Sequence, residues 1–377
     1  MHPFRVGVCL LGLAAVAAAR GSSSSLVDPQ ATRETAALFR NLQRLPADRI
    51  LFGHQHATET GHGWSGDPDR SDVKSVVGSH PAVIGVDFGH LSGFPAEEIA
   101  KAKASLQKTI VDTYNRGGVT TVSWHFVNPV TPATGFRWKR GVSAAAVRDI
   151  IPGGAHHDAY RAILQTVAEL AHALRGADGT LAPVIFRPYH EFDGDWFWWG
   201  KAHTTREDFI ALWRFTVAYL RDTLHVHNFL YAFSPDMKFE TEAEYLERYP
   251  GDAWADLVGF DDYGDFGRRG KYNLAGGLQR LRIVSDYAAR NGKLAALTET
   301  GLESLTDENW WTGVLLKTLQ NENLKLAYVL VWRNDPQSPT HFYAPFPGHP
   351  SAPDFVRFFE DPRTVFESDR PELYRTE

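Results

Sequence analysis

Short apolar runs rich in β-branched residues alternate along the chain with longer amphipathic stretches. This alternation is typical of buried parallel strands separated by crossover helices. Eight runs follow one another: Arg49–Gly53, Ala82–Asp87, Val119–His125, Ala182–Arg187, Asn228–Ser234, Leu257–Asp261, Lys293–Thr298 and Leu326–Trp332. Eight strands with helical crossovers predict an α/β fold of the (β/α)8 barrel type, in a single catalytic domain.

Several of the amphipathic stretches carry start and stop signals for helices. Thr205 precedes two acids and reads as a helix cap, and Asn291-Gly292 reads as a helix stop. The helices expected on this basis are Glu97–Asn115, Asp158–Arg175, Thr205–Leu224, Leu278–Arg290 and Asp307–Leu319. A doubly wound sheet is the alternative, but it normally needs a glycine-rich loop after its first strand, where this chain has Gly53-His54-Gln55-His56.

The first residues have the pattern of a secretory signal. Arg5 precedes the apolar run Val6–Ala18, which is too short to span a membrane, and Ala17-Ala18-Ala19 offers a cleavage site. We therefore expect a signal peptide at residues 1–19, a short linker at 20–30 and the catalytic domain at 31–377. The mature protein would be secreted, either outside the cell or into the periplasm. The only cysteine, Cys9, lies within the signal, so the mature protein would contain no disulfide.

The charge pattern argues against nucleic acid as a partner. The formal net charge is −6, both signs are mixed along the chain, and no block of Lys and Arg is present. The 11 Trp residues suit a neutral ligand such as a sugar, whose rings stack on exposed indoles. We expect a monomer that binds a polysaccharide, does not bind membranes and needs no cofactor.

Two glutamates stand where a barrel places its chemistry, just past the C-terminal ends of strands. Glu191 follows the fourth predicted strand and Glu299 the seventh. A single Glu after a strand is usually a cap or a solvated charge, as we expect for Glu303. Here two glutamates follow strands four and seven, and one of them stands beside the Trp-rich loop 196–199. This arrangement favours the carboxyl pair of a retaining glycosidase, in which the two groups lie about 5 Å apart. His190 and Tyr263 are candidates for separating their pKa values.

Motifs from residue 51 to residue 334 occur in the order known from one enzyme family. They are Leu51–Gln55 (LFGHQ), Ser123–His125 (SWH), Arg187–Glu191 (RPYHE), Trp196–Gly200 (WFWWG), Gly259–Tyr263 (GFDDY), Leu297–Gly301 (LTETG) and Val331–Asn334 (VWRN). In these segments the chain resembles glycoside hydrolase family 26, which consists mainly of β-mannanases. The family belongs to a clan of retaining enzymes with the acid/base after strand four and the nucleophile after strand seven.

The resemblance implies a role for each matching residue. Glu191 would be the acid/base, with His190 before it where most of the clan has Asn, and Glu299 would be the nucleophile. Tyr263 would hold the nucleophile by a hydrogen bond, and Arg333 would reach a more distal sugar. The sugar at or next to the cleavage point would be lined by His125, Trp196 and Trp332. The implied activity is hydrolysis of β-1,4-mannan; β-1,3-xylan and mixed-linkage β-glucan are alternatives within the family.

Three segments depart from the family pattern, and they bear on substrate detail. They are the acidic Phe192–Asp195, the His-rich His54–Trp64 and the Gly/Pro-punctuated Thr131–Ala155.

Two other classes of protein remain as alternatives. The spacing His54-Gln55-His56 can bind zinc, as in a metal-dependent amidohydrolase, although Glu191, Asp236 and Asp261 stand where that class would place its other ligands. We expect His54 to be a hydrogen-bonding residue of the rim. The second alternative is a non-catalytic sugar-binding barrel, which would keep the Trp residues but could lose a carboxylate.

Overall fold

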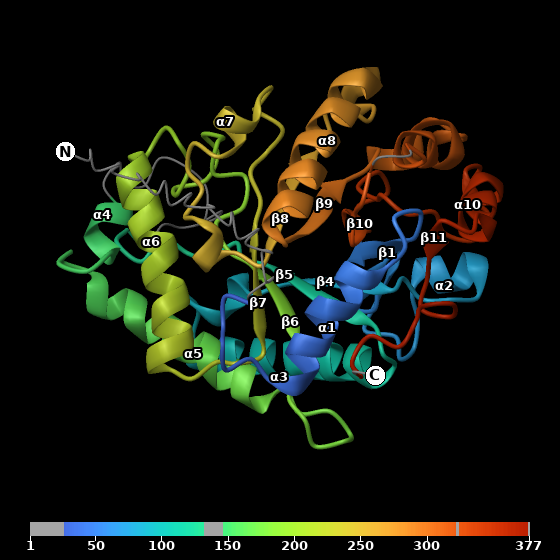
Figure 1. Ribbon diagram of the computed structural model, residues 1–377. Helices are drawn as coiled ribbons and strands as arrows, with labels where there is room; N and C mark the ends of the chain where they lie inside the picture. Colours follow the sequence, from blue (N-terminus) through green and yellow to red (C-terminus); the bar gives the residue numbers. More distant parts are fainter. Residues whose placement is uncertain (1–25, 132–145, 322–323, 376–377) are drawn as a thin grey trace, which may run out of the picture.

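Eight parallel strands form a closed ring at the centre of the molecule, with helices around them (Figure 1). The structure, a computed structural model, describes residues 26–131, 146–321 and 324–375. Neighbouring strands follow the order β10-β9-β8-β7-β6-β5-β4-β1, and β1 pairs in parallel with β10 to close the barrel. The barrel strands are β1 Ile50–Gln55, β4 Val83–Asp87, β5 Val119–Ser123, β6 Val184–Arg187, β7 Phe229–Phe233, β8 Leu257–Asp262, β9 Leu294–Thr300 and β10 Tyr328–Val331. Each coincides with one of the eight expected runs, so the predicted (β/α)8 fold is confirmed.

The helices lie outside the ring, mostly between successive strands. They are α1 Arg33–Arg44, α2 Asp72–Val77, α3 Ala96–Asn115, α4 Ala146–Ile150, α5 His157–Ala173, α6 Arg206–Ala218, α7 Glu242–Tyr245, α8 Leu274–Asn291, α9 Lys317–Leu319 and α10 Ala352–Glu360. The expected cap of α6 is present, because the Thr205 hydroxyl accepts the N–H of Asp208 at 3.1 Å. The expected stop of α8 is Gly292, whose φ of 64° suits glycine.

The helix expected at Asp307–Leu319 differs in type. A π-helical segment, Trp311–Leu316, forms its central part, and α9 is its last turn. Thr312 in this segment bonds Asp354 of α10 through its N–H, at 3.0 Å, and through its hydroxyl, at 2.5 Å. The periodic sequence pattern predicts the helix but not this contact between two distant helices.

Two short additions complete the fold. A hairpin of β2 Thr60–Gly61 and β3 Trp64–Ser65 follows β1, within the His-rich segment. Near the C-terminus, β11 Thr364–Val365 pairs with the N-terminal half of β1. The ring of Phe52 packs against the aromatic rings of Trp311, Phe355, Phe358 and Phe366, which fastens the C-terminal helix and β11 to the barrel.

The predicted boundary of the domain needs a correction at its start. Val27 and Asp28 are buried, and the N–H of Val27 donates to Asp256 at 2.8 Å. The packed domain therefore begins inside the linker predicted at 20–30. The predicted signal peptide, residues 1–19, lies outside the described residues, and so does most of the insertion 131–155, of which residues 132–145 are not described.

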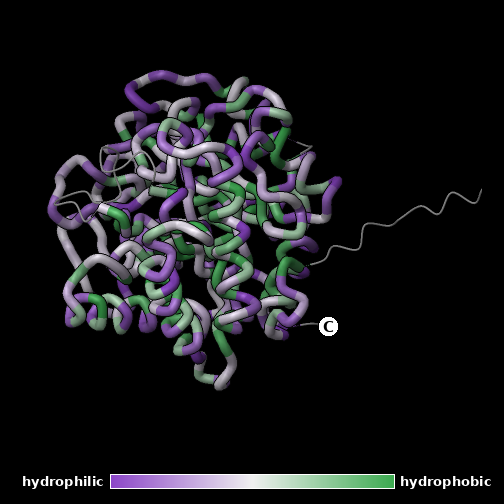
Figure 2. Tube along the Cα trace, turned by 90° about the vertical axis from the view of Figure 1, so that its left-hand side faces the viewer, coloured by the Kyte–Doolittle hydropathy of each residue, from purple (hydrophilic) through white to green (hydrophobic). Residues whose placement is uncertain are grey.

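Apolar side chains fill the barrel and the layer between strands and helices. Figure 2 shows hydrophobic segments running through the middle of the molecule, with hydrophilic segments towards the outside. Every residue of seven barrel strands is buried, and β4 is buried except at Asp87. Such continuous burial is why the strands appear in the sequence as unbroken apolar runs.

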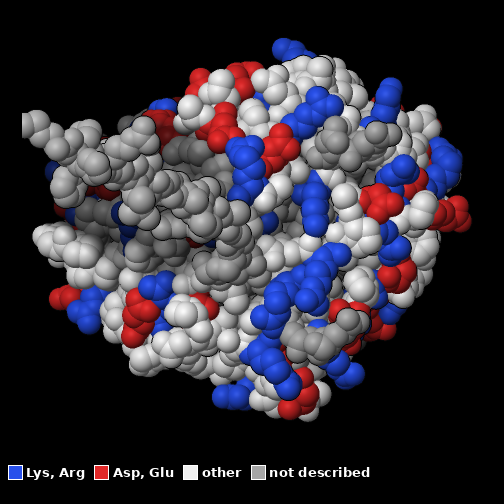
Figure 3. Space-filling view, viewed as in Figure 1, with Lys and Arg blue, Asp and Glu red and all other residues white. Residues whose placement is uncertain are grey.

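The surface carries charges of both signs. In Figure 3 acidic and basic side chains are interspersed, with a run of basic side chains over α1. Apart from that run, charges of both signs alternate on the face in view. None of the helices in the described ranges combines the length and the apolar character needed to cross a lipid bilayer.

Candidate active site

A buried arginine joins two carboxylates at the C-terminal mouth of the barrel. Arg187, the last residue of β6, donates to Asp261 at 2.9 Å and also to Glu299, and all three side chains are almost fully buried. The second oxygen of Glu299 accepts the hydroxyl of Tyr263 at 2.9 Å. Both oxygens of Glu299 are thus held by donors, which fixes the direction of its carboxylate.

A β-bulge in β9 brings Glu299 to this position. Phe260 of β8 pairs with Leu297, but the next residue, Asp261, pairs with Glu299, so Thr298 is an extra residue in β9. The pairing between β9 and β10 shifts by one residue at the same place in β9. The Thr298 hydroxyl donates to Asp261 at 2.7 Å while Glu299 contacts Arg187. The bulge therefore turns two successive side chains towards the same polar cluster, a known use of bulges beside active sites.

A strained turn after β6 presents Glu191. Tyr189 and Glu191 both have a φ of 53°, a left-handed conformation that costs a non-glycine residue about 1–3 kcal/mol. The turn is held from two sides: the N–H of Glu191 donates to the Ser234 carbonyl at 2.9 Å, and the Trp199 indole donates to the His190 carbonyl at 2.9 Å. These contacts compensate the strain and fix Glu191 above the end of the barrel.

The environment of Glu191 favours its protonated form. Burial raises the pKa of Glu191 well above its ordinary value, and the charges of Asp261 and Glu299 raise it further. One guanidinium, that of Arg187, already pairs with the two other carboxylates. A third negative charge beside these two carboxylates is disfavoured, so Glu191 keeps its proton and can act as an acid.

Two histidines line the mouth beside the glutamates. Nδ1 of His125 contacts Asp87, the last residue of β4, at 2.6 Å, and the rings of His125 and His190 meet edge to face at 4.5 Å. Burial acts to raise the pKa of Asp87, but the charge of His125 and hydrogen bonds from His125 and Ser123 bring it well below its ordinary value. Burial, with the charges of Arg187 and His125, lowers the pKa of His190. His190 is therefore neutral at neutral pH.

The residues expected to contact sugar are half-buried. The Trp196 indole N–H donates to Glu191 at 2.5 Å, and the Trp332 ring lies 6.1 Å from the ring of His125. Arg333, the neighbour of Trp332, pairs with Asp335 at 2.9 Å. The structure therefore brings Glu191, Glu299, Tyr263, His125, His190, Trp196 and Trp332 to one mouth of the barrel, with Arg333 beside Trp332.

Comparisons with known proteins agree with this geometry. The family model for glycosyl hydrolase family 26 matches residues 27–302. The chain belongs to glycosyl hydrolase family 26. A relative, the mannan endo-1,4-β-mannosidase of Bifidobacterium adolescentis, is 34% identical over 371 residues, which are 93% of this chain and 36% of that protein. This chain thus spans about a third of the length of that relative.

Solved structures of family 26 are similar in fold over almost the whole chain. GH26C from a Muricauda species superimposes with a TM-score of 0.86 at 38% identity, covering 94% of this chain and 96% of that one. A GH26 β-mannanase from Bacteroides ovatus superimposes with a TM-score of 0.83 at 39% identity, covering 92% and 98%.

Several aromatic residues near the mouth are structural. Trp124, Trp198 and Trp199 are buried, so they pack in the core and offer no face to a ligand. His54 stands next to the last residue of β1, but its side chain is fully buried, so the expectation that it lies exposed on the rim is wrong. Burial lowers the pKa of His54 to about 4, which keeps it neutral.

The two histidines of the zinc spacing have different surroundings. Nδ1 of His56 contacts Glu59 at 2.6 Å, whereas His54 is enclosed in the barrel. Within the described residues, His190, Asp261 and Glu299 do present possible ligand atoms within 4.8 Å of one another. The guanidinium of Arg187 contacts both carboxylates of that group.

Four further residues of the site are expected from the sequence only as polar groups at strand ends, without a role of their own: Arg187, Asp261, Asp87 and Ser234. Their position at strand ends is a signal that the sequence does contain. Ser234 donates to Asp261 at 3.0 Å, and Asp87 holds His125, so both act through other residues. Nothing in the sequence pattern distinguishes such supporting residues from ordinary strand-end polar residues.

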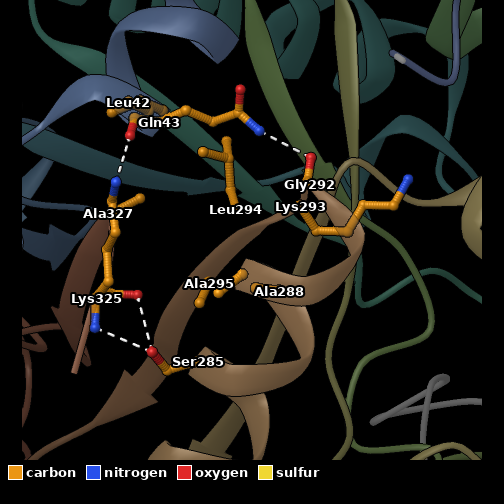
Figure 4. A pocket seen from close by; sticks show the side chains of 11 residues that line it. Leu42, Gln43, Ser285, Ala288, Gly292, Lys293, Leu294, Ala295, Lys325 and Ala327 are labelled. Carbon is orange, nitrogen blue, oxygen red and sulfur yellow. Dashed lines mark hydrogen bonds between the residues drawn. The ribbon is translucent and has the colours of Figure 1, made fainter. Parts of the chain in front are cut away.

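A separate cavity lies at the opposite end of the barrel (Figure 4). It has a volume of about 260 Å³ and lies between α1, α8 and the starts of β9 and β10. Gln43 of α1 closes one side by donating to the Gly292 carbonyl at 2.8 Å, and Lys325 donates to the Gln43 carbonyl at 2.6 Å. Its lining contains none of the family 26 catalytic residues, so it has no part in the chemistry described above.

We expect Trp332→Ala to weaken substrate binding strongly while costing little stability. A fully buried Trp replaced by Ala costs roughly 3–5 kcal/mol, but Trp332 is half-buried beside His125. Trp213→Ala is the matched control, because Trp213 is fully buried in α6 and should show the full loss. Thermal unfolding together with KM measures both effects. A melting temperature lowered as far as in Trp213→Ala, with KM unchanged, would show that Trp332 only packs.

Proposed function

We propose that this protein is a retaining β-glycosidase that hydrolyses β-1,4-mannan, as a mannan endo-1,4-β-mannosidase does. The observation that carries the proposal is the contrast between two glutamates at one mouth. Glu299 is fixed by Arg187 and Tyr263, and Glu191 has a raised pKa. A nucleophile and an acid are the two groups that retaining hydrolysis requires. Membership of family 26, and the activity named for its relatives, support the choice of substrate.

In the first step Glu299 attacks the anomeric carbon of the bound sugar. A bond forms between a carboxylate oxygen and that carbon, while the bond to the leaving oxygen breaks and Glu191 gives its proton to that oxygen. In the second step Glu191, now ionised, takes a proton from water, which attacks the same carbon and releases Glu299. Two inversions give a product with the configuration of the substrate.

The other groups of the mouth position the substrate and the two glutamates. His125, held by Asp87, and Trp332 line the space next to Glu191, and Arg333 extends the surface beyond Trp332. Tyr263 and Arg187 keep Glu299 in line for attack. Neutral His190 adds no charge next to Glu191.

A reducing-sugar assay tests the substrate class. Mannan and galactomannan should be hydrolysed, with xylan, β-1,3-xylan and mixed-linkage β-glucan as comparisons. The Glu191→Ala variant is the control for contaminating activity. Faster release from β-1,3-xylan or mixed-linkage glucan would keep the fold and the mechanism but move the substrate to one of these alternatives. Sugar binding without release from any glycan would favour a non-catalytic barrel.

We expect activity to survive treatment with EDTA. The two-carboxylate mechanism needs no metal, and Arg187 already supplies positive charge between Asp261 and Glu299. Activity is measured on mannan before and after chelation and dialysis. Loss of activity that zinc restores would instead support the metal-dependent amidohydrolase.

We further propose that the mature protein is secreted and acts as a monomer. The pattern of Arg5, the apolar run and Ala17-Ala18-Ala19 supports export. N-terminal sequencing of protein from the native cell should return a start between residues 20 and 25. A native chain beginning with Met1 would contradict export, and a dimer in size-exclusion chromatography would contradict the monomer.

A further inference from the structure

One acidic segment near the site has no role in the chemistry described so far. Asp193 lies in Phe192–Asp195, directly after Glu191. Its two carboxylate oxygens accept the backbone N–H groups of Asp236, at 2.6 Å, and Lys238, at 3.3 Å. Asp236 and Lys238 belong to the loop that follows β7. Asp193 therefore ties the loop that carries the acid/base to the next loop around the barrel.

The two loops meet again at the indole of Trp196. Nζ of Lys238 lies 4.4 Å from the centre of the Trp196 ring, a cation–π contact. The six-membered ring of the same indole lies against Gly194, where a Cβ would come within 2.4 Å of it. One loop thus supplies the glycine and the other supplies the cation that hold the ring.

The orientation of this ring matters for Glu191. The Trp196 N–H donates to Oε2 of Glu191 at 2.5 Å. In a protonated carboxyl, the oxygen that accepts such a bond is the carbonyl oxygen, so the proton sits on the other oxygen, Oε1. The direction of the indole therefore decides which oxygen of Glu191 can give its proton to the leaving group.

We infer that Asp193, Gly194 and Lys238 form a clamp that holds Trp196, and that this clamp sets the orientation of the acid/base Glu191. The inference rests on the proposed function, because it assigns a positioning role for that reaction. Lys238 and Asp193 are positioning residues in it, since they act through Trp196. The main contribution of Trp196 is then its bond to Glu191, with part of its ring covered by an ammonium group.

The test compares Lys238→Met with Lys238→Arg and with a matched control, Lys201→Met. Lys238 is exposed, so its replacement should leave the fold intact. Lys201 lines the same cavity of about 270 Å³, but its ammonium group pairs with Glu247 at 2.6 Å. For each variant, kcat and KM are measured on a manno-oligosaccharide and on a dinitrophenyl glycoside, together with the melting temperature.

A misoriented acid slows only those substrates whose leaving group needs a proton. For Lys238→Met we expect kcat on the oligosaccharide to fall about three- to tenfold, with KM nearly unchanged and with less than about a twofold loss on the dinitrophenyl glycoside. Lys238→Arg should restore most of the loss, because a guanidinium also stacks on an indole. Asp193→Ala should give the same selective loss as Lys238→Met, and Lys201→Met should match the wild type.

Other outcomes would overturn the clamp. Equal losses on both substrates would indicate a general structural effect, and a raised KM with unchanged kcat would mean that Lys238 binds sugar directly. If Lys201→Met showed the same loss of kcat as Lys238→Met, the positive charge of the cavity would be its cause, and not the contact with Trp196. A wild type inactive on every β-glycan would overturn the proposed function itself, whereas an active wild type with an unaffected Lys238→Met would overturn the clamp alone.

Discussion

Glu299→Ala should abolish hydrolysis of every glycoside, whatever its leaving group. Without the carboxylate no covalent glycosyl intermediate can form, and a better leaving group cannot replace a missing nucleophile. The measurement is turnover of mannan and of a dinitrophenyl glycoside. Both should fall to the background of the assay.

Glu299→Gln is the control for the fold. It keeps the shape of a side chain that contacts both Arg187 and Tyr263 but removes the charge. It should be as inactive as Glu299→Ala. Azide added to Glu299→Ala can enter the vacated space, and any glycosyl azide formed should have the configuration opposite to that of the substrate. Substantial turnover of the dinitrophenyl glycoside by Glu299→Gln without azide would show that Glu299 is not the nucleophile.

The sequence predicts the barrel well because each of its signals is local. Strands buried on both faces must be continuous apolar runs, and caps such as Thr205 and Gly292 lie next to the helix ends that they mark. The π-helical segment Trp311–Leu316 was not predictable, because it forms where Thr312 meets Asp354, far away in the sequence. The burial of Val27 likewise depends on a distant residue, Asp256.

The site, like the barrel, has parts that local sequence signals predict and parts that depend on distant residues. Strand number alone places Glu191 and Glu299 at one mouth, since all barrel strands point the same way. The bulge at Thr298 and the left-handed turn at Glu191 depend on several strands at once, so no local pattern announces them. The clamp at Asp193 is the part of the site that the sequence predicts least. Asp193 lies in a segment that departs from the family pattern, and the two backbone N–H groups that it accepts belong to a loop more than 40 residues away, so no local pattern predicts its role.

Glu191→Ala should lose activity to an extent that depends on the leaving group, whereas Glu299→Ala should lose activity on every substrate. It removes proton transfer, which is commonly worth about 10²–10⁴-fold in rate, but leaves the nucleophile in place. The loss should therefore be large for mannan and small in the first step for a dinitrophenyl glycoside, whose leaving group needs no proton. Pre-steady-state release of dinitrophenol should be rapid, followed by slow turnover as the intermediate accumulates.

The pH dependence gives a second test of Glu191. Its pKa is raised by burial and by Asp261 and Glu299, so the proton is held at neutral pH and lost as pH rises through that raised value. The activity of the wild type should fall along this basic limb, whereas Glu191→Ala should lack it with an activated substrate. A basic limb that persists in Glu191→Ala would assign the acid to another group.

Azide should rescue Glu191→Ala in a way that identifies the mechanism. Once the intermediate has formed, azide needs no general base, so it can replace the water that Glu191 would have activated. It attacks from the face that the leaving group vacated, and the glycosyl azide should keep the anomeric configuration of the substrate. NMR of the product distinguishes the two configurations. An inverted azide from Glu191→Ala, or equal losses in both glutamate variants for activated and unactivated substrates, would show that the two roles are wrongly assigned.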